Sequence, residues 1–193
     1  MTVFNSFEER YLPCLVERLM SLWGVNGETD EFNRLYVEMV VRTNMHLNDI
    51  QFQLTENNSL KAIAFGAAKN DKEYSDWYLK HLKTMDIHAK SIFETGRKYL
   101  LRMEEKTFSL MNEDDVKLCL FVSLETGWGK IILAQVMEKF KSRGYKNMFL
   151  WTDSECNVQW YFDNGYQLLE QEEYEPFSTD VQKYMTYIFK KSL

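Results

Sequence analysis

The segment with the most chemical content is Gly127-Trp128-Gly129, which follows the apolar run Lys117–Val122 and precedes a helical pattern. A glycine-containing turn at the start of a helix leaves backbone N–H groups free to bind an anion. We therefore predict a site for a phosphate-bearing ligand at this turn. The hydroxyl of Tyr161, on the next helix-forming segment, is a candidate proton donor.

The spacing of apolar residues predicts the elements that position these groups. A period near 3.6 indicates helices, and alternation of apolar and polar residues indicates strands. The predicted helices are 12–23, 29–43, two within 71–106 that meet near 85–90, one that ends at Gly144, and a short one around 157–161. The predicted strands are 50–54, 60–67, 117–122, 148–152, 166–174 and 184–189, with Asn57-Asn58 as a hairpin turn. This order predicts an α/β fold with a mixed sheet and a single domain, residues 1–193.

Composition narrows the class of protein. Of the 193 residues, 45% are hydrophobic, which is enough for a substantial core in one domain. The formal net charge of −6 argues against a nucleic-acid or anionic-membrane partner. No segment reaches the ~18 consecutive apolar residues that span a bilayer, and the first ten residues lack the pattern of a signal peptide. We expect a cytoplasmic protein.

The cysteines and histidines do not predict a metal site or a disulfide framework. The cysteines are Cys14, Cys119 and Cys156, an odd and widely spaced set without a Cys-x-x-Cys motif. Cys119 is interpreted as a small core residue of its strand. His81 and His88 lie on a charged helical segment, where we expect surface positions.

The stretch from Val116 to about Glu170 resembles the Gcn5-related N-acetyltransferases. The resemblance rests on Gly127-Trp128-Gly129, Gly144-Tyr145, Trp151-Thr152-Asp153, Cys156-Asn157 and Tyr161-x-x-x-Gly165-Tyr166. In that family a strand leads into a loop of pattern Gln/Arg-x-x-Gly-x-Gly/Ala, which cradles the pyrophosphate of acetyl-coenzyme A. Gly127 and Gly129 match its last two fixed positions, whereas Leu124 occupies the position of the Gln or Arg.

The resemblance implies roles for particular residues. Acetyl-coenzyme A would be held at its pyrophosphate by the turn and at its pantetheine arm by the strand before it. Tyr161 falls where many members place the tyrosine that protonates the leaving thiolate. Asn157 would either bind cofactor amides or cap the helix, and the residues 71–106 form a helical insertion. The implied cofactor-binding residues are Phe121, Val122, Ser123, Thr126, Gly127, Trp128, Gly129, Lys130 and Asn157.

The implied reaction is transfer of the acetyl group of acetyl-coenzyme A directly to a primary amine of a small molecule or a peptide. The base that accepts the proton of the amine is not determined. The candidates are Glu125, Asp153 and the three histidines, His46, His81 and His88. The insertion 71–106 would be a wall of the acceptor pocket, a homodimer surface or a lid. One alternative is a non-catalytic acyl-coenzyme A sensor or interaction protein with the same fold, which Leu124 and the unassigned base favour. Another is an α/β domain without a cofactor.

Overall fold

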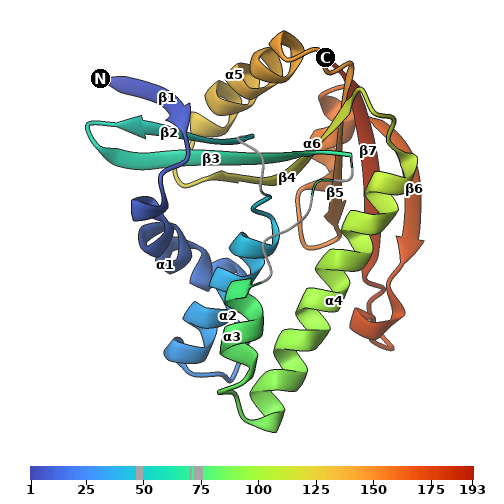
Figure 1. Ribbon diagram of the computed structural model, residues 1–193. Helices are drawn as coiled ribbons and strands as arrows, with labels where there is room; N and C mark the ends of the chain where they lie inside the picture. The colour runs from blue at the N-terminus through green and yellow to red at the C-terminus, as the bar shows by residue number, and fades with distance from the viewer. Residues whose placement is uncertain (47–49, 70, 72–75) are drawn as a thin grey trace.

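A mixed β-sheet forms the centre of the molecule. The computed structural model describes residues 1–46, 50–69, 71 and 76–193. Seven strands lie in the order β1-β2-β3-β4-β5-β7-β6 (Figure 1). β4 and β5 are parallel, and the other neighbouring pairs are antiparallel, which confirms the predicted mixed sheet. The strands are β1 (Thr2–Ser6), β2 (Gln51–Glu56), β3 (Ser59–Ala68), β4 (Asp115–Ser123), β5 (Asn147–Asp153), β6 (Gln167–Glu173) and β7 (Met185–Ser192).

The predicted helices are confirmed, and local capping explains where several of them begin. The Thr29 hydroxyl accepts from the N–H of Phe32 at the start of α2, and the Asp86 carboxylate accepts from that of Ala89 at the start of α4. The helices are α1 (Leu12–Trp23), α2 (Asp30–Thr43), α3 (Asp76–Leu82), α4 (Ile87–Leu110), α5 (Trp128–Ser142) and α6 (Val158–Asp163), with single 3-10 turns at η1 (Glu9–Tyr11) and η2 (Glu175–Phe177).

The N-terminal strand and the hairpin show what local patterns do and do not reveal. β1 was not predicted, because its residues are mostly exposed and carry no clear alternation; it is held by pairing with β2. The hairpin turn at Asn57 and Asn58 is confirmed, with φ of 51° and 63°. Asparagine tolerates this left-handed region better than most residues do. Residues 72–75, which belong to the predicted helical insertion 71–106, lie outside the described residues.

β4 and β5 separate along their length. They pair only over Asp115–Lys117 and Asn147–Phe149. At this closed end the Asn147 side chain donates to the Asp115 carboxylate, N to O 2.6 Å. The register between β3 and β4 skips Cys119, which is therefore a β-bulge that bends the strand. Beyond Lys117, the edge of β4 that faces β5 has no paired strand in the described part of the chain.

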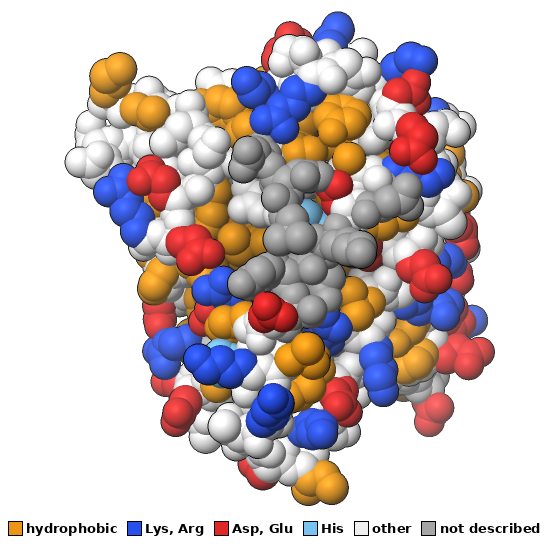
Figure 2. Space-filling model, viewed as in Figure 1, with side chains coloured by type: hydrophobic (Ala, Val, Ile, Leu, Met, Phe, Trp, Pro, Cys, Tyr) orange, Lys and Arg blue, Asp and Glu red, His pale blue; other side chains and the backbone are white. Residues whose placement is uncertain are grey.

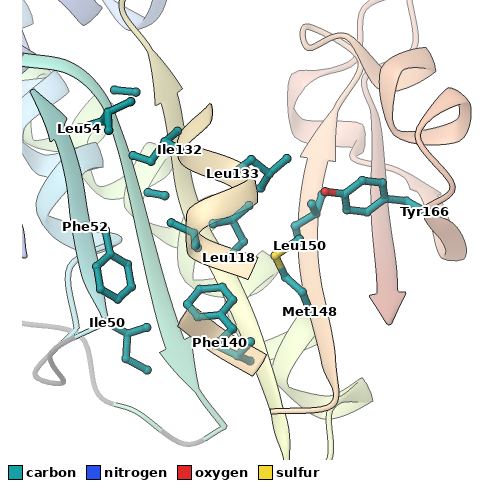
Figure 3. Packing of buried hydrophobic residues seen from close by; sticks show 14 of the residues in the cluster. Ile50, Phe52, Leu54, Leu118, Ile132, Leu133, Phe140, Met148, Leu150 and Tyr166 are labelled. Carbon is teal, nitrogen blue, oxygen red and sulfur yellow. The ribbon is translucent and has the colours of Figure 1, made fainter. Parts of the chain in front are cut away.

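α5 covers one face of the sheet. Leu118 of β4 and Leu150 of β5 point to this face (Figure 3), and Phe189 of β7 belongs to the same apolar cluster. They pack against the apolar stripe of the helix, which includes Ile132 and Phe140. This cluster is the largest apolar core among the described residues, and it fixes the start of α5 relative to the end of β4.

α1, α2 and α4 cover the opposite face. Leu120 of β4 packs with Leu15 of α1, while Ile188 of β7 packs with Tyr99 and Met103 of α4. Ile188 and Phe189 are consecutive in β7, and consecutive side chains of a strand point to opposite faces, so α4 and α5 lie on opposite sides. The inserted helices α3 and α4 thus complete this layer (Figure 1).

Charged side chains of both signs are mixed over the side of the molecule that is seen in Figure 1. Figure 2 shows Lys and Arg interspersed with Asp and Glu there, and its described residues form no broad basic surface. Within the described residues, no helix has both the length and the apolar character needed to cross a membrane.

Candidate active site

The N-terminus of α5 is exposed and has no side-chain cap. Gly127 precedes the helix with φ of 94°, a conformation that glycine adopts without steric cost. A Cβ at this position would meet no atom within 4 Å, so the backbone here faces open space. Thr126 and Lys130 flank it and are exposed. The first backbone N–H groups of the helix, together with its macrodipole, therefore fit an anion such as a diphosphate.

Gly129 has a different role from Gly127. A Cβ on Gly129 would lie 3.3 Å from the ring of Phe121 and 3.3 Å from Cβ of Ser123, both in β4. The absence of a side chain lets the first turn of α5 lie against the end of this strand. Gly127 thus allows the backbone conformation at the helix start, and Gly129 allows the helix start to lie close to β4.

Side chains next to the turn are paired with each other. Lys61 of β3 lies 2.7 Å from a carboxylate oxygen of Glu125 and 6.0 Å from the centre of the Trp128 ring. Lys61 holds the pKa of Glu125 below its usual value, chiefly through this hydrogen bond. The backbone N–H of Leu124 donates to the carbonyl of Lys61. The side chain of Leu124 packs against the apolar cluster that contains Leu15 of α1. Leu124 therefore anchors the loop to β3 rather than contributing a polar side chain.

Phe121, Val122 and Ser123 form the end of β4 beyond the bulge. On one edge they pair with β3. On the other edge they face the gap between β4 and β5, where main-chain groups remain open among the described residues. An extended ligand lying along this edge would find the donors and acceptors that a neighbouring strand normally uses.

Tyr161 lies on α6, on the same side of the sheet as α5. Its ring stacks on Phe189, with centroids 5.3 Å apart, and meets the ring of Tyr166 edge-on. Burial, with smaller contributions from Cys156 and Asp153, raises the pKa of Tyr161 to about 12. The phenol is therefore protonated at neutral pH, as a proton donor must be.

Tyr166 and Asn157 border the same region. The hydroxyl of Tyr166 is buried and has no hydrogen-bond partner among the described residues; Figure 3 shows it directed toward Leu150 of β5. An orphaned hydroxyl at this depth fits a polar ligand entering the gap. The Asn157 side chain accepts from the N–H of Trp160 and so caps α6. Its predicted contact with a cofactor stays a prediction.

Asp153 ends β5 and holds two hydrogen bonds. One carboxylate oxygen accepts from the Tyr99 hydroxyl of α4 at 3.2 Å, and the other accepts from the N–H of Glu155 at 3.1 Å. Asp153 also makes a small contribution to the raised pKa of Tyr161. Of the two acidic candidates for the base, Asp153 is bound to Tyr99 and Glu155, and Glu125 is bound to Lys61.

A polar cluster on the opposite face was missed by the sequence analysis. His46, which follows α2, is 3% exposed, and Cys119, predicted as a core residue, is half-buried with its sulfur toward this ring. Lys117 was a usable signal, because a lysine inside an apolar strand needs a buried partner. That partner is Glu104 of α4, 3.1 Å away. The described residues contain no group of three or more metal-ligating side chains.

Comparison with known proteins gives matches at the level of structure. No family profile matches the sequence, and no curated protein sequence matches it. The ribosomal-protein-S18-alanine N-acetyltransferase of Escherichia coli superposes with a TM-score of 0.58 at 14% identity, covering 100% of this chain and 94% of its own. The C-terminal condensation domain of Ebony, solved with beta-alanyl-dopamine, gives 0.64 at 10% identity, covering 100% and 99%. The mosquito protein named arylalkylamine N-acetyltransferase like 5b gives a TM-score of 0.56 at 13% identity, and the match covers both chains fully.

These similarities extend over the whole chain. Because the sequence identity is so low, these similarities establish the fold alone. The protein has the Gcn5-related N-acetyltransferase fold.

Proposed function

We propose that the protein transfers the acetyl group of acetyl-coenzyme A directly to a primary amine of a small molecule or peptide. The observation that carries the proposal is the continuity of two open backbone surfaces. The uncapped start of α5 at Gly127 follows directly on β4, and the β4 edge beyond Lys117 faces a gap. A molecule with a diphosphate at one end and an extended, amide-bearing arm matches both surfaces.

Each part of the donor has a matching group. The diphosphate would bind the N–H groups of Thr126–Lys130, with the Lys130 side chain adding a positive charge. The pantetheine arm would pair with the main chain of Phe121–Ser123, much as a strand would. Holding the thioester in this way against the amine supplies much of the rate gain, because the two reactants no longer have to meet by diffusion.

Tyr161 would protonate the coenzyme A sulfur as it leaves. Its raised pKa keeps the proton on the phenol until negative charge develops on sulfur. Asp153 would accept the proton of the incoming amine, directly or through a water molecule. The amine acceptor is consistent with the structural neighbours, which by name include N-acetyltransferases of arylalkylamines and polyamines.

The test compares Tyr161→Phe with Tyr187→Phe. Both tyrosines stack on Phe189, so each change removes one hydroxyl from the same aromatic cluster. We expect Tyr161→Phe to lower turnover by about 10²-fold or more with little change in the affinity for coenzyme A. Tyr187→Phe should leave both unchanged. Turnover is measured as thiol release on a panel of amines, and affinity by calorimetry.

The same measurements separate the alternatives. Coenzyme A binding without acetylation of any amine would favour the non-catalytic sensor. Absence of coenzyme A binding would contradict both readings. Unaltered turnover in Tyr161→Phe would remove this tyrosine as the acid and leave the transfer reaction standing.

A further inference from the structure

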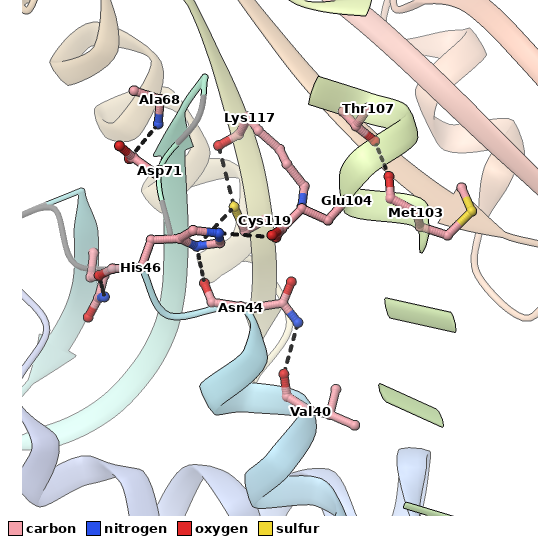
Figure 4. A network of polar contacts seen from close by, with 11 residues as sticks. Val40, Asn44, His46, Ala68, Asp71, Met103, Glu104, Thr107, Lys117 and Cys119 are labelled. Carbon is pink, nitrogen blue, oxygen red and sulfur yellow. Dashed lines mark hydrogen bonds and ion pairs between the residues drawn. The ribbon is translucent and has the colours of Figure 1, made fainter. Parts of the chain in front are cut away.

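Four buried or half-buried polar side chains from three separate elements meet beside the bulge of β4 (Figure 4). Nε2 of His46 lies 3.0 Å from Oε2 of Glu104, and Nζ of Lys117 lies 3.1 Å from the same oxygen. Sγ of Cys119 lies 3.8 Å from Nδ1 of His46. None of these residues has a role in the transfer reaction proposed above.

The order sulfur, imidazole, carboxylate is the order of nucleophile, base and orienting acid in covalent catalysis. Glu104 and the Asn44 carbonyl hold the two nitrogens of the ring. Nε2 faces the carboxylate, and Nδ1 lies 3.3 Å from the Asn44 oxygen as well as facing Cys119. Nε2 makes no hydrogen bond to a described residue within the usual geometric limits, and its ion pair with the Glu104 carboxylate requires a ring that carries two protons.

The charges around the ring support that state. Burial alone would lower the pKa of His46, but Cys119 and Glu104 together outweigh it and raise the pKa to about 10. Glu104 is shared with Lys117, which is fully buried, so one carboxylate faces two cations.

The place of Cys119 in the fold points to the ligand. It lies two residues beyond the last pairing of β4 with β5, where the gap begins. A chain that runs from the α5 N-terminus along β4 passes Ser123 and then Cys119, roughly 13 Å further on at ~3.3 Å per residue. Its sulfur lies on the α4 side of the sheet, 3.8 Å from His46, and the residue is half-buried, whereas Cys14 and Cys156 are exposed.

We propose that Cys119 accepts an acyl group from an acyl thioester, with His46 holding the thiol proton and Glu104 orienting the ring. The bond from Sγ to the carbonyl carbon forms while the bond from that carbon to the departing sulfur breaks. The departing thiol ends with the proton that Cys119 lost, so one thioester and one thiol are exchanged for another. Water or an amine then takes the acyl group, and Cys119 regains a proton. The inference rests on the proposed use of acetyl-coenzyme A and adds a second route for the acetyl group.

The test uses the intact wild-type protein with acetyl-coenzyme A and no amine. After quenching in acid, we expect a mass increase of one acetyl group that peptide mapping places on Cys119. Cys119→Ala should abolish the label, whereas Cys14→Ala and Cys156→Ala should keep it. A thioester that hydrolyses before the quench would still appear as amine-independent thiol release that Cys119→Ala lacks.

Glu104→Gln tests the positioning role, with the exposed Glu105→Gln on the same helix as its control. Labelling should slow by about 10²-fold or more in Glu104→Gln, while stabilisation of the protein by coenzyme A stays unchanged. A merely structural role would reduce both together.

The outcomes distinguish this inference from the proposed function. Amine acetylation with neither a label on Cys119 nor Cys119-dependent thiol release would overturn the inference and leave the proposed function in place. Absence of coenzyme A binding would overturn both.

Discussion

At the scale of single residues, the unusual environments lie on both sides of the gap between β4 and β5. On the α5 side, Tyr161 and Tyr166 place two phenols in an apolar cluster. On the α4 side, Glu104 pairs with His46 and Lys117. A core built only for stability would favour apolar side chains at these positions, because buried ion pairs seldom stabilise more than apolar residues of the same volume.

Replacing Glu104 by Gln should destabilise the protein by about 3 kcal/mol, because the change leaves two buried cations without their shared anion. The free energy of unfolding, from urea denaturation, measures the effect. Glu105→Gln on the exposed side of α4 should stay within about 0.5 kcal/mol of the wild type. Equal losses in the two variants would show that the buried contacts do not stabilise the fold.

The same cluster predicts how stability depends on pH. The pKa of His46 is about 10 in the folded protein and ordinarily 6.5, so its stabilisation is full below pH 6.5 and is lost as the pH rises through about 10. The pKa of Glu104 is lowered by His46 and Lys117 against the opposing effect of burial. Its contribution is therefore present above the ordinary value of 4.5 and is lost as the pH falls through the folded value. Urea titrations across this range should show both losses in the wild type and weaker ones in Glu104→Gln.

Two tyrosines should respond in opposite directions to loss of the hydroxyl. Tyr166→Phe removes a buried hydroxyl that has no partner within the described part of the chain, and we expect a gain of about 1 kcal/mol in the free energy of unfolding. Tyr99→Phe removes a donor to the Asp153 carboxylate and should cost about 1.5 kcal/mol. A loss of stability in Tyr166→Phe would mean that its hydroxyl is satisfied in the folded protein.

At the scale of elements, α5 is flanked at each end by a glycine at positive φ. Gly127 has φ of 94° and Gly144 has φ of 90°, and a Cβ at either would meet nothing within 4 Å. Alanine at each should cost a similar ~1–2 kcal/mol of backbone strain. We expect only Gly127→Ala to weaken coenzyme A binding, as measured by calorimetry. Equal affinities in the two variants would contradict an anion site at the start of the helix.

Most elements could be predicted from sequence because their patterns are local. The apolar spacing of α1 and α2 and the alternation in β2 follow from burial on one face. The turn at Gly127 could be found because glycine marks both a conformation and a close approach. The cluster of His46, Glu104 and Cys119 could not, since its members are joined only through the packing of α2 and α4 on the sheet. The bulge that presents Cys119 also leaves no mark in a single sequence.

At the scale of the whole molecule, β4 and β5 are paired at one end of the sheet and separate toward the other. Asp115 and Asn147 join β4 and β5 where they pair, and α5 and α4 close the two faces. A ligand bound in the gap would contact both halves of the sheet, β1–β4 and β5–β7. Binding would therefore link the two halves and stabilise the fold as a unit.

This linkage gives a prediction for the intact protein. At a coenzyme A concentration about 100 times its dissociation constant, the free energy of unfolding should rise by about 2.7 kcal/mol. For a chain of this size that corresponds to an increase of roughly 5–10 °C in Tm. Gly127→Ala should show a smaller increase at the same coenzyme A concentration, because it alters the proposed diphosphate site. Gly144→Ala should show the full increase.

Adenosine diphosphate should give part of the increase, since it would occupy the α5 end without reaching the gap. An equal increase with adenosine diphosphate and coenzyme A would contradict a contact of the pantetheine arm with β4, and no increase with either would contradict the anion site.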